Sequence, residues 1–305
     1  AKAPNNSLLG SSQYRIPFPI GLWIYNGFAK YNHGFGKWIF NRFAATPVFI
    51  SSVNPDVRQK VATNILHDYG YFNGTVSYQT FVNPKDSLKA KLQYTVDMRN
   101  PYFIDTVYYR GFNDTTMRII NLGRRRSLIS PGEQFNVTDL DGERTRISGL
   151  LRNMGDYYFR PDYLTYQADT TLVPGGHVSL RMIPGMPKDA ERPFFVGNTN
   201  FYLHGPQGQV PNDSLYYKNF WIHYYNKLKI RPNMLYRWLH YQGYQRKRQE
   251  LDKGGMRRRP DKLYSQYRQT RIQERLASVG IFRYLEMQYT PRDTALVSDT
   301  LDVNI

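Results

Sequence analysis

Six histidines, one dense acidic cluster and two glycine pairs are the features of this chain that could support catalysis or bind a ligand. The histidines include no H-x-x-x-H or comparable ligand pair, and the absence of cysteine excludes thiolate zinc sites, thiol catalysis and disulfides. Asp139, Asp141 and Glu143 lie near the start of a predicted helix, where acidic side chains ordinarily interact with the helix dipole. Gly175-Gly176 and Gly254-Gly255 lack the strand-to-helix switch of a phosphate-binding loop. The sequence therefore predicts no enzyme, no metal site and no cofactor.

Charge and composition narrow the kinds of partner that the chain can have. Its 305 residues include 41 Lys and Arg against 24 Asp and Glu, a formal net charge of +17, and 41% of them are hydrophobic. This content supports packed domains, and no segment has the pattern of a membrane helix or a signal peptide. The charge predicts attraction to nucleic acid, anionic lipid or an acidic protein.

Nucleic-acid binding is the function that two arginine clusters could indicate. Arg124-Arg125-Arg126 and the cluster between Arg246 and Arg259 have tyrosines nearby, and tyrosine can stack on bases. Both clusters fall in predicted loops and helix ends rather than along one strand face. We therefore interpret them as solvated basic loops, expect no nucleic-acid partner, and keep a basic nucleic-acid-binding module as an alternative.

A repeated pattern organises the chain. Three times, a helical pattern ends in a glycine followed by aromatic residues, and two strand patterns follow. The helical patterns cover 55–69, 138–154 and 266–279, and the strand pairs cover 75–81 with 88–96, 163–168 with 178–183, and 282–289 with 301–305. In 88–96 the alternation predicts that Leu92 is core and Lys91 faces solvent.

Further elements precede the second and third long helices. Opening strands are predicted at 102–109 and 194–203, each followed by a short helix, at 115–121 and 234–240. The repeating unit is therefore strand, short helix, long helix, strand, strand, which makes the chain an α+β protein of small modules. We expect a helical lead-in at 1–47 belonging to an incomplete first module, the first module at 48–99 without its opening strand, the second at 100–190, and the third at 191–305 with a basic insertion at 245–260.

Aromatic residues are dense within the lead-in. Trp23, Tyr25, Trp38, Phe40 and Phe43 fall in apolar helical turns. We expect these turns to pack against the first module, with membrane contact as the alternative.

A series of short motifs accompanies this order of elements along the chain. The motifs are Leu8-Leu9-Gly10, Leu22 to Asn26, Pro47-Val48, Gly70 to Asn73, Ser130 to Asn136, Leu150 to Asn153, Lys229 to Pro232 with Leu235, Leu263 to Ser265 and Arg275 to Phe282. Together with the order of elements and the glycine-aromatic helix ends, they resemble the POTRA domain of the BamA/TamA outer-membrane assembly superfamily, and most of all the TamL lipoprotein family of Bacteroidota. The resemblance implies tandem POTRA-like β-α-α-β-β modules, each a three-stranded mixed sheet covered by two helices on one face.

Two features of that family are absent from the sequence, the lipidated N-terminal cysteine and the C-terminal membrane β-barrel. We therefore expect this chain to be the periplasmic segment of a longer protein, attached to the outer membrane through both. The resemblance implies unfolded outer-membrane proteins as clients, and a TamB-like periplasm-spanning protein or other assembly-machine subunits as partners.

In the family's fold, the second strand of each module lies at a sheet edge, where its unpaired backbone groups can accept an extended segment. Backbone hydrogen bonds tolerate many sequences, which suits a receptor or scaffold for many clients. A purely structural spacer is the alternative, and covered or bulged edges would favour it. Carried over by position, the partner-binding edge residues are Thr75, Val76, Ser77, Tyr78, Gln79, Tyr163, Leu164, Thr165, Tyr166, Arg283, Tyr284, Glu286 and Gln288.

The tripeptide Asp-[Ser/Thr]-[Ala/Ile/Leu/Val/Met/Thr], which looks like the O-glycosylation sequon of exported Bacteroidota proteins, occurs seven times. Turns that favour Asp-Ser/Thr before strands are the alternative cause. Thr106 falls within a predicted strand and should be spared, because a glycan needs an exposed site. The candidate sites, which we expect mostly in loops, are Ser87, Thr115, Thr170, Ser214, Thr294 and Thr300.

The intact mass of the protein from its native host decides between these two causes. Glycosylation predicts a mass above that of the bare polypeptide, with glycans on the six candidate sites and none on Thr106. A mass equal to that of the bare polypeptide, or a glycan on Thr106 alone, would contradict it.

Overall fold

A computed structural model describes residues 20–84, 86–171, 173–185, 187, 191–239, 263–292 and 298–305, and the side chains of 86–89 are not described. The Leu8-Leu9-Gly10 motif and the insertion at 245–260 lie outside these residues. The chain forms two compact units. Unit 1 runs to Phe103 and also contains Gln134–Asn136, and unit 2 contains Ile104–Glu133 and Val137–Ile305.

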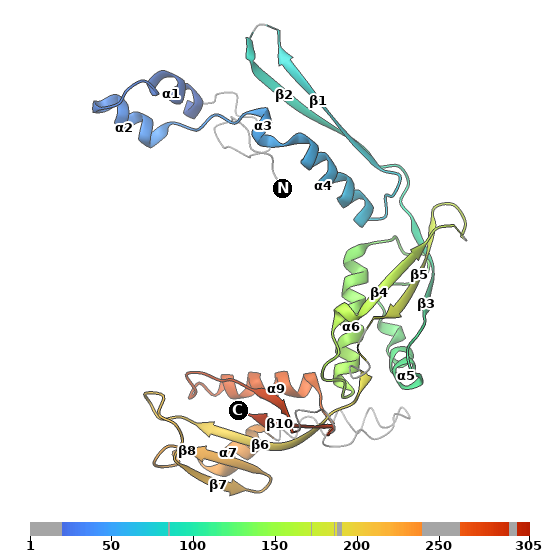
Figure 1. The fold of residues 1–305 in the computed structure, drawn as a ribbon, viewed down its shortest axis with the longest axis vertical. Helices are drawn as coiled ribbons and strands as arrows, with labels where there is room; N and C mark the ends of the chain where they lie inside the picture. The colour runs from blue at the N-terminus through green and yellow to red at the C-terminus, as the bar shows by residue number, and fades with distance from the viewer. Residues whose placement is uncertain are drawn as a thin grey trace. The chain divides into compact units, whose positions relative to one another are not determined.

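The described part of unit 1 contains three short helices, one longer helix and one long hairpin (Figure 1). The helices are α1 (Ile20–Phe28), α2 (Gly34–Phe43), α3 (Ile50–Val53) and α4 (Pro55–Asp68), and the hairpin strands are β1 (Thr75–Asn83) and β2 (Asp86–Asp97). The hairpin is antiparallel, and α4 packs against β1. We expected the lead-in to pack against this module, but α1 and α2 pack mainly on each other.

The second module has the predicted order of elements. It contains β3 (Phe103–Tyr109), α5 (Asp114–Leu122), the 3-10 turn η1 (Arg124–Arg126), α6 (Val137–Asn153), the 3-10 turn η2 (Pro161–Tyr163), β4 (Leu164–Asp169) and β5 (His177–Pro184). The strands form one sheet in the order β3-β5-β4. One core joins Ile120 of α5 and Ile147 and Leu151 of α6 to Leu164 and Met182 of the sheet, so both helices cover the same face.

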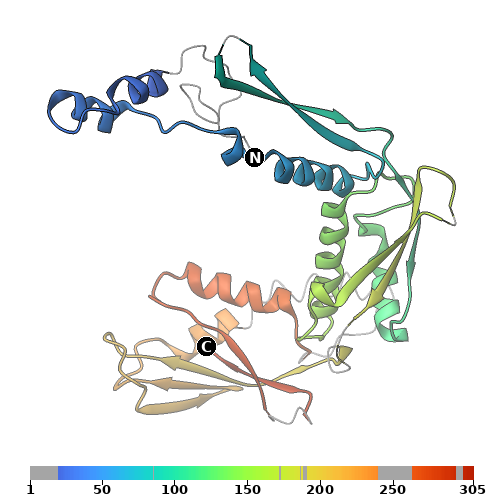
Figure 2. The ribbon, with the colours of Figure 1, turned by 45° about the horizontal axis from the view of Figure 1, so that its top comes forward.

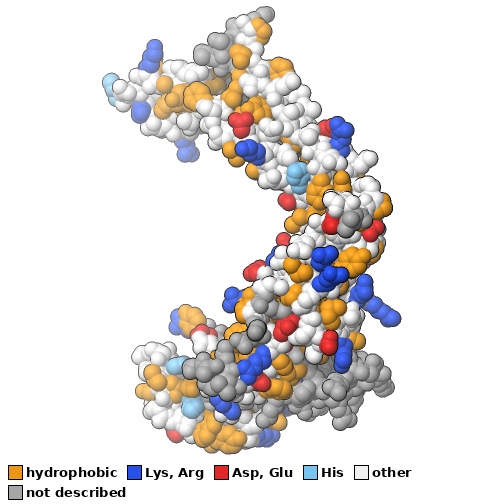
Figure 3. Space-filling model, turned by 45° about the vertical axis from the view of Figure 1, so that its right-hand side comes forward, with side chains coloured by type: hydrophobic (Ala, Val, Ile, Leu, Met, Phe, Trp, Pro, Cys, Tyr) orange, Lys and Arg blue, Asp and Glu red, His pale blue; other side chains and the backbone are white. Residues whose placement is uncertain are grey.

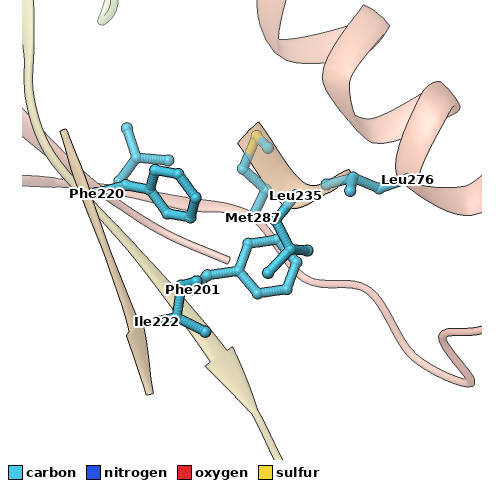
Figure 4. Close-up of a cluster of buried hydrophobic side chains, with 7 residues drawn as sticks. Phe201, Phe220, Ile222, Leu235, Leu276 and Met287 are labelled. Atoms are coloured by element: carbon cyan, nitrogen blue, oxygen red, sulfur yellow. The ribbon is translucent and has the colours of Figure 1, made fainter. Parts of the chain in front are cut away.

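The third module has a larger sheet. Its elements are β6 (Phe195–Leu203), β7 (Asp213–Tyr217), β8 (Phe220–Tyr224), α7 (Pro232–Leu239), α9 (Gln266–Ser278), β9 (Gln288–Pro291) and β10 (Thr300–Asn304). The strand order is β7-β8-β6-β10-β9, and α9 lies along one face of this sheet (Figure 2). The core of the module, which places Leu235 of α7 and Leu276 of α9 against Phe201, Phe220 and Ile222 of the strands, is drawn in Figure 4.

The α+β class with mixed sheets is confirmed, whereas the strand number differs between modules. The described sheets have two, three and five strands, so the expected three-stranded sheet occurs in the second module. The β7–β8 hairpin was not predicted. Its turn includes Lys218 at φ 56, a left-handed conformation that usually selects Asn or Gly, so the common turn signal is missing there.

The ends of the long helices are built alike in two places. In unit 2, the amide of Phe194 donates to the carbonyl of Gly155 at 3.0 Å, and the amide of Tyr264 donates to the carbonyl of Phe194 at 2.8 Å. In unit 1, Tyr102 donates to Gly70 and Phe135 donates to Tyr102, each at 2.9 Å. In both places, the carbonyl of the glycine after a long helix accepts a hydrogen bond from an aromatic residue that follows a proline. The carbonyl of that aromatic residue accepts a second hydrogen bond, from the aromatic residue that precedes the next long helix.

Gly155 is required at its position for two reasons. Its φ of +116° is one that L side chains rarely adopt, and a Cβ there would lie 2.8 Å from Leu263 Cδ1 and 2.9 Å from Pro193 Cβ. Asn153, two residues earlier, accepts from the Tyr267 amide at 2.8 Å and from the Ser265 hydroxyl. The end of α6 therefore also caps the start of α9.

The alternation in β2 predicts unequal effects of two neighbouring substitutions. Leu92 is half-buried and Lys91 is exposed. Leu92→Asp should lower the free energy of unfolding of the hairpin by about 1–3 kcal/mol, because it places a charge against apolar neighbours, and Lys91→Asp should leave it nearly unchanged. Hydrogen exchange of the β1 and β2 amides measures both effects. Equal losses of protection in the two variants would contradict this register.

Candidate partner-binding edges

The β4 strand forms an open and regular sheet edge. It pairs with β5 from Leu164↔Pro184 to Asp169↔Ser179 without a register shift. The sheet order places β4 at the edge, and β5 is its main packing partner among the described elements. This edge is therefore neither bulged nor covered by another described element.

Two backbone hydrogen bonds identify the groups of β4 that point outward. The Gly185 amide donates to the Tyr163 carbonyl at 2.7 Å, and the Arg110 amide, which follows β3, donates to the Met182 carbonyl at 3.0 Å. Because hydrogen-bonded and non-hydrogen-bonded pairs alternate along an antiparallel ladder, the pair Tyr166↔Met182 is non-hydrogen-bonded. The amides and carbonyls of Tyr166 and Ala168 therefore point away from β5, toward the open side.

Side chains of β4 alternate between the core and the open face. Leu164 is fully buried, Thr165 is exposed and Tyr166 is half-buried. Burial raises the pKa of the Tyr166 phenol, and the charge of Glu143 raises it further. Tyr163, which was predicted as part of the strand, lies in the 3-10 turn η2 and stacks edge-on with Phe159.

The β1 edge already has partners within unit 1. Thr75, Val76, Ser77, Tyr78 and Gln79 all lie in β1, and Val76 is buried whereas Thr75, Ser77 and Gln79 are exposed. The side-chain amide of Gln59, from α4, donates to the Val76 carbonyl at 2.7 Å, and the Tyr78 hydroxyl donates to a carboxylate oxygen of Asp56 at 2.7 Å. The helix α4 thus occupies part of the hydrogen-bonding capacity of this strand.

The third predicted edge strand is wrong over most of its length. Residues 282–287 are not in a strand, so Arg283, Tyr284 and Glu286 lie in irregular chain, and of the predicted site residues only Gln288 lies in β9. The aromatic ring of Phe282 and the side chain of Leu285 pack instead against the core of the third module. This packing overrides the strand propensity of the segment.

The short β9 edge offers few free backbone groups. The Arg292 amide donates to the Thr300 carbonyl, so by alternation the backbone of Tyr289 and Pro291 points outward. The Tyr157 hydroxyl donates to the Tyr289 carbonyl at 3.5 Å, and Pro291 has no amide hydrogen. This edge is a poor acceptor for an added strand.

Glu143 has a structural role that its position in the sequence did not reveal. We expected it to interact with the helix dipole, but it is fully buried in the second turn of α6. Its carboxylate accepts from the Arg146 guanidinium at 2.6 and 2.7 Å, from the Leu128 amide and from the Ser127 hydroxyl. Burial alone would raise the pKa of Glu143, but these donors outweigh it and lower the pKa. The Glu143 carboxylate therefore holds the Ser127–Leu128 segment against α6, and both of its oxygens accept hydrogen bonds in this role.

Asp156 is a second buried carboxyl, located directly after Gly155. Burial raises its pKa from 3.8 to about 7, and the nearby charge of Glu191 contributes. The side-chain amide nitrogen (Nδ2) of Asn113 donates to a carboxylate oxygen of Glu191 at 2.8 Å. Local spacing could not predict this pair, because Asp156 and Glu191 are far apart in the sequence.

The candidate glycosylation sites occupy more regular structure than we expected. Thr170 lies outside the strands and is exposed, Thr115 is exposed in the first turn of α5, Ser214 is exposed in β7, and Thr300 is half-buried in β10. Thr106 is half-buried within β3, where its hydroxyl lies 2.9 Å from that of Ser179. Thr294 and the side chain of Ser87 lie outside the described residues.

Three further observations bear on function. No group of three or more histidines and acids that could hold a metal ion occurs among the described residues. The helices in that part of the chain are all too short or too polar to cross a membrane. Arg124–Arg126 form an exposed 3-10 turn at the end of α5 rather than a strand face.

Comparisons with known proteins give structural likenesses only. No family model and no curated protein matches the sequence. The chain is similar to POTRA domains 3–5 of BamA from Haemophilus influenzae, with 13% identity and a TM-score of 0.38 over 85% of this chain and 81% of that one. It is also similar to BamA from Haemophilus ducreyi lacking POTRA domains 1–3, with 16% identity and a TM-score of 0.32 over 54% of this chain and 27% of that one. The third similar structure is the N-terminal domain of Omp85 from the thermophilic cyanobacterium Thermosynechococcus elongatus, with 14% identity and a TM-score of 0.25 over 88% of each chain. Because these TM-scores are low, the helices and strands of this chain, and not the similar structures, define its fold.

The raised pKa of Asp156 predicts a specific pH dependence of stability. The folded state binds this proton more tightly than the unfolded state, so the free energy of unfolding falls as the pH rises from about 4 through about 7. Asp156→Asn removes the titrating group. It should therefore stabilise the protein by ~1–3 kcal/mol at pH 8 and change it little at pH 4.

Denaturant unfolding of both proteins at the two pH values measures this difference. The matched control is Asp162→Asn, because the side chain of Asp162 is 90% exposed. An Asp156→Asn effect that is the same at pH 4 and pH 8 would refute the assignment.

Proposed function

We propose that this chain is a non-catalytic periplasmic receptor or scaffold region for the assembly or translocation of outer-membrane proteins, and that it binds client or partner segments by strand addition. The open β4 edge is the observation that supports this proposal most strongly. Its outward amides and carbonyls at Tyr166 and Ala168 can pair with any extended segment, because backbone groups are common to all sequences.

The POTRA resemblance of the sequence supports the same function. Two of its motifs lie at the ends of long helices, because Leu150 to Asn153 form the last turn of α6 and Leu263 to Ser265 directly precede α9. We extend the proposal to membership of the TamL branch, to a TamB-like partner, and to attachment at the outer membrane through a lipidated N-terminus and a C-terminal barrel. The sequence of the gene beyond both ends of this chain tests these extensions directly.

Two carboxyls that could have indicated an active site support the non-catalytic part of the proposal. Glu143 is bonded to Arg146, Leu128 and Ser127, which leaves it no free role as a base. The pKa of Asp156, about 7, would suit a general acid or base. The charged group that influences it is another carboxylate, Glu191, which is neither a nucleophile that Asp156 could activate nor a cation that could stabilise a developing negative charge.

The alternative of a structural spacer is favoured by the other edges. The β9 strand is short and its outward carbonyl accepts from Tyr157, and Gln59 bonds the backbone of β1. The proposal therefore makes β4 the principal binding edge and leaves β1 as a secondary one.

Proline substitution tests the β4 edge. Ala168→Pro removes one outward amide, whereas Ala168→Val keeps that amide and adds a side chain of similar bulk. Loss of one hydrogen bond is worth ~0.5–1.5 kcal/mol, so Ala168→Pro should weaken binding about threefold to tenfold, and Ala168→Val should not. Fluorescence anisotropy with a labelled peptide from the last strand of an outer-membrane barrel measures the affinity.

The β1 edge is tested in the same assay by proline at Val76 or Ser77, with the stronger effect expected where the amide faces outward. Thermal unfolding of each variant shows whether it folds. Affinity that is the same in the wild type, Ala168→Pro and both β1 variants would favour the spacer instead.

A further inference from the structure

The α1–α2 hairpin carries a cluster of exposed aromatic rings. Phe35 is 73% exposed, Trp38 is 57% exposed and Phe43 is 53% exposed. The rings of Phe35 and Trp38 stack at 5.6 Å, and Phe43 meets Trp38 edge-on at 6.0 Å. Neither helix contains a buried side chain. Large rings gathered on a surface in this way mark an interaction site.

Contacts within the hairpin hold this cluster in place. The Ala45 amide donates to the Gly21 carbonyl at 2.9 Å, and the two residues lie so close that a Cβ on Gly21 would be 2.6 Å from Ala45 Cβ. Between the helices, the rings of Tyr25 and Phe40 lie 5.4 Å apart. The hairpin therefore forms through residues other than the exposed rings, and substitution of the rings should leave it folded.

The charge around the cluster has a single sign. Lys30, Lys37 and Arg42 lie in or between the two helices, and the first acidic residue of the whole sequence is Asp56. The ammonium of Lys37 lies 5.3 Å from the centre of the Phe40 ring. On the face drawn in Figure 3, blue and orange side chains lie side by side in this part of unit 1.

We propose that the α1–α2 hairpin binds the surface of an anionic lipid bilayer, with Phe35, Trp38 and Phe43 in the headgroup region. The indole of Trp38 suits that region because it has a polar N–H on an apolar ring, Phe rings occur on the apolar face of helices that lie at the membrane interface, and nearby Lys and Arg add attraction to anionic headgroups. The absence of acids suits a surface of uniform negative charge. A second copy of the hairpin fits less well, because it would bring like charges together.

This inference is independent of the strand edges and of the function proposed for them. From the sequence, we expected the lead-in to pack against the first module and kept membrane contact as the alternative. The present proposal takes that alternative, because α1 and α2 pack mainly on each other and not on the rest of unit 1. The chain could bind vesicles without binding peptides at β4, or bind peptides at β4 without binding vesicles. The two proposals are therefore tested by separate experiments.

The test is flotation of the full chain with phosphatidylcholine vesicles that do or do not contain phosphatidylglycerol. The wild type should bind the anionic vesicles and bind phosphatidylcholine alone much more weakly. The double variant Phe35→Ser/Trp38→Ser should lose about tenfold in affinity, because it removes most of the exposed apolar area of the cluster. Lys30→Glu/Lys37→Glu should lose at least tenfold, and its remaining binding should fall as salt rises.

Matched controls separate the hairpin from the overall charge of +17. Tyr284→Ser removes another exposed ring, which is 86% exposed, and Arg125→Glu reverses another exposed charge. Both controls should bind nearly as well as the wild type. Circular dichroism checks that each variant is folded, and quenching of tryptophan fluorescence by brominated lipid reports ring insertion in the wild type.

Several outcomes would overturn the proposal. These are no binding of the wild type to anionic vesicles, equal losses in the hairpin variants and the controls, or no quenching by brominated lipid. A wild-type dimer that Phe35→Ser/Trp38→Ser converts to a monomer, without a change in vesicle binding, would assign the cluster to self-association instead.

Discussion

The hydrogen bond from the Phe194 amide to the Gly155 carbonyl is the contact on which the arrangement within unit 2 depends. This bond places the start of β6 beside the end of α6. The Tyr264 amide donates to the Phe194 carbonyl, which places the start of α9 at the same point. The Tyr264 ring is fully buried and meets Tyr157 and Tyr289 edge-on. This backbone contact, together with the packing of the Tyr157, Tyr264 and Tyr289 rings beside it, thus sets where a strand and a long helix of the third module begin.

The placement of the opening strands also bears on which sheet edges remain open. An opening strand begins at the glycine end of the previous helix, and in the second module it pairs with the last strand, β5, on the side opposite β4. Among the described strands, none therefore pairs with the outward backbone groups of Tyr166 and Ala168. In the third module, Tyr157 reaches from the glycine segment to β9 and occupies that edge. The availability of an edge thus depends on which side chains reach its outward backbone groups, as Tyr157 does at β9 and Gln59 does at β1.

Local signals made much of the fold predictable. Three helices end at the expected glycine positions, and the Ser265 hydroxyl caps α9 by accepting from the Arg268 amide. The strand predicted at 282–289 was mostly wrong, because Phe282 and Leu285 are drawn into a core that the local pattern does not show. The burial of Glu143 was equally hidden, since its donors at Ser127 and Leu128 precede it by fifteen residues or more. Contacts that depend on tertiary packing could not be read from spacing alone.

Gly280 ends α9 as Gly70 and Gly155 end their helices, but its surroundings differ. Both earlier glycines are buried, whereas Gly280 is exposed, and no described atom lies within 4 Å of the place a Cβ would take. Its φ of +71° is nevertheless in the left-handed region. No described strand pairs with this turn, so its conformation is set by the local chain, and the turn is already formed before any segment docks on it. A segment that docks on such a turn loses its own conformational freedom but does not have to order the helix end as well.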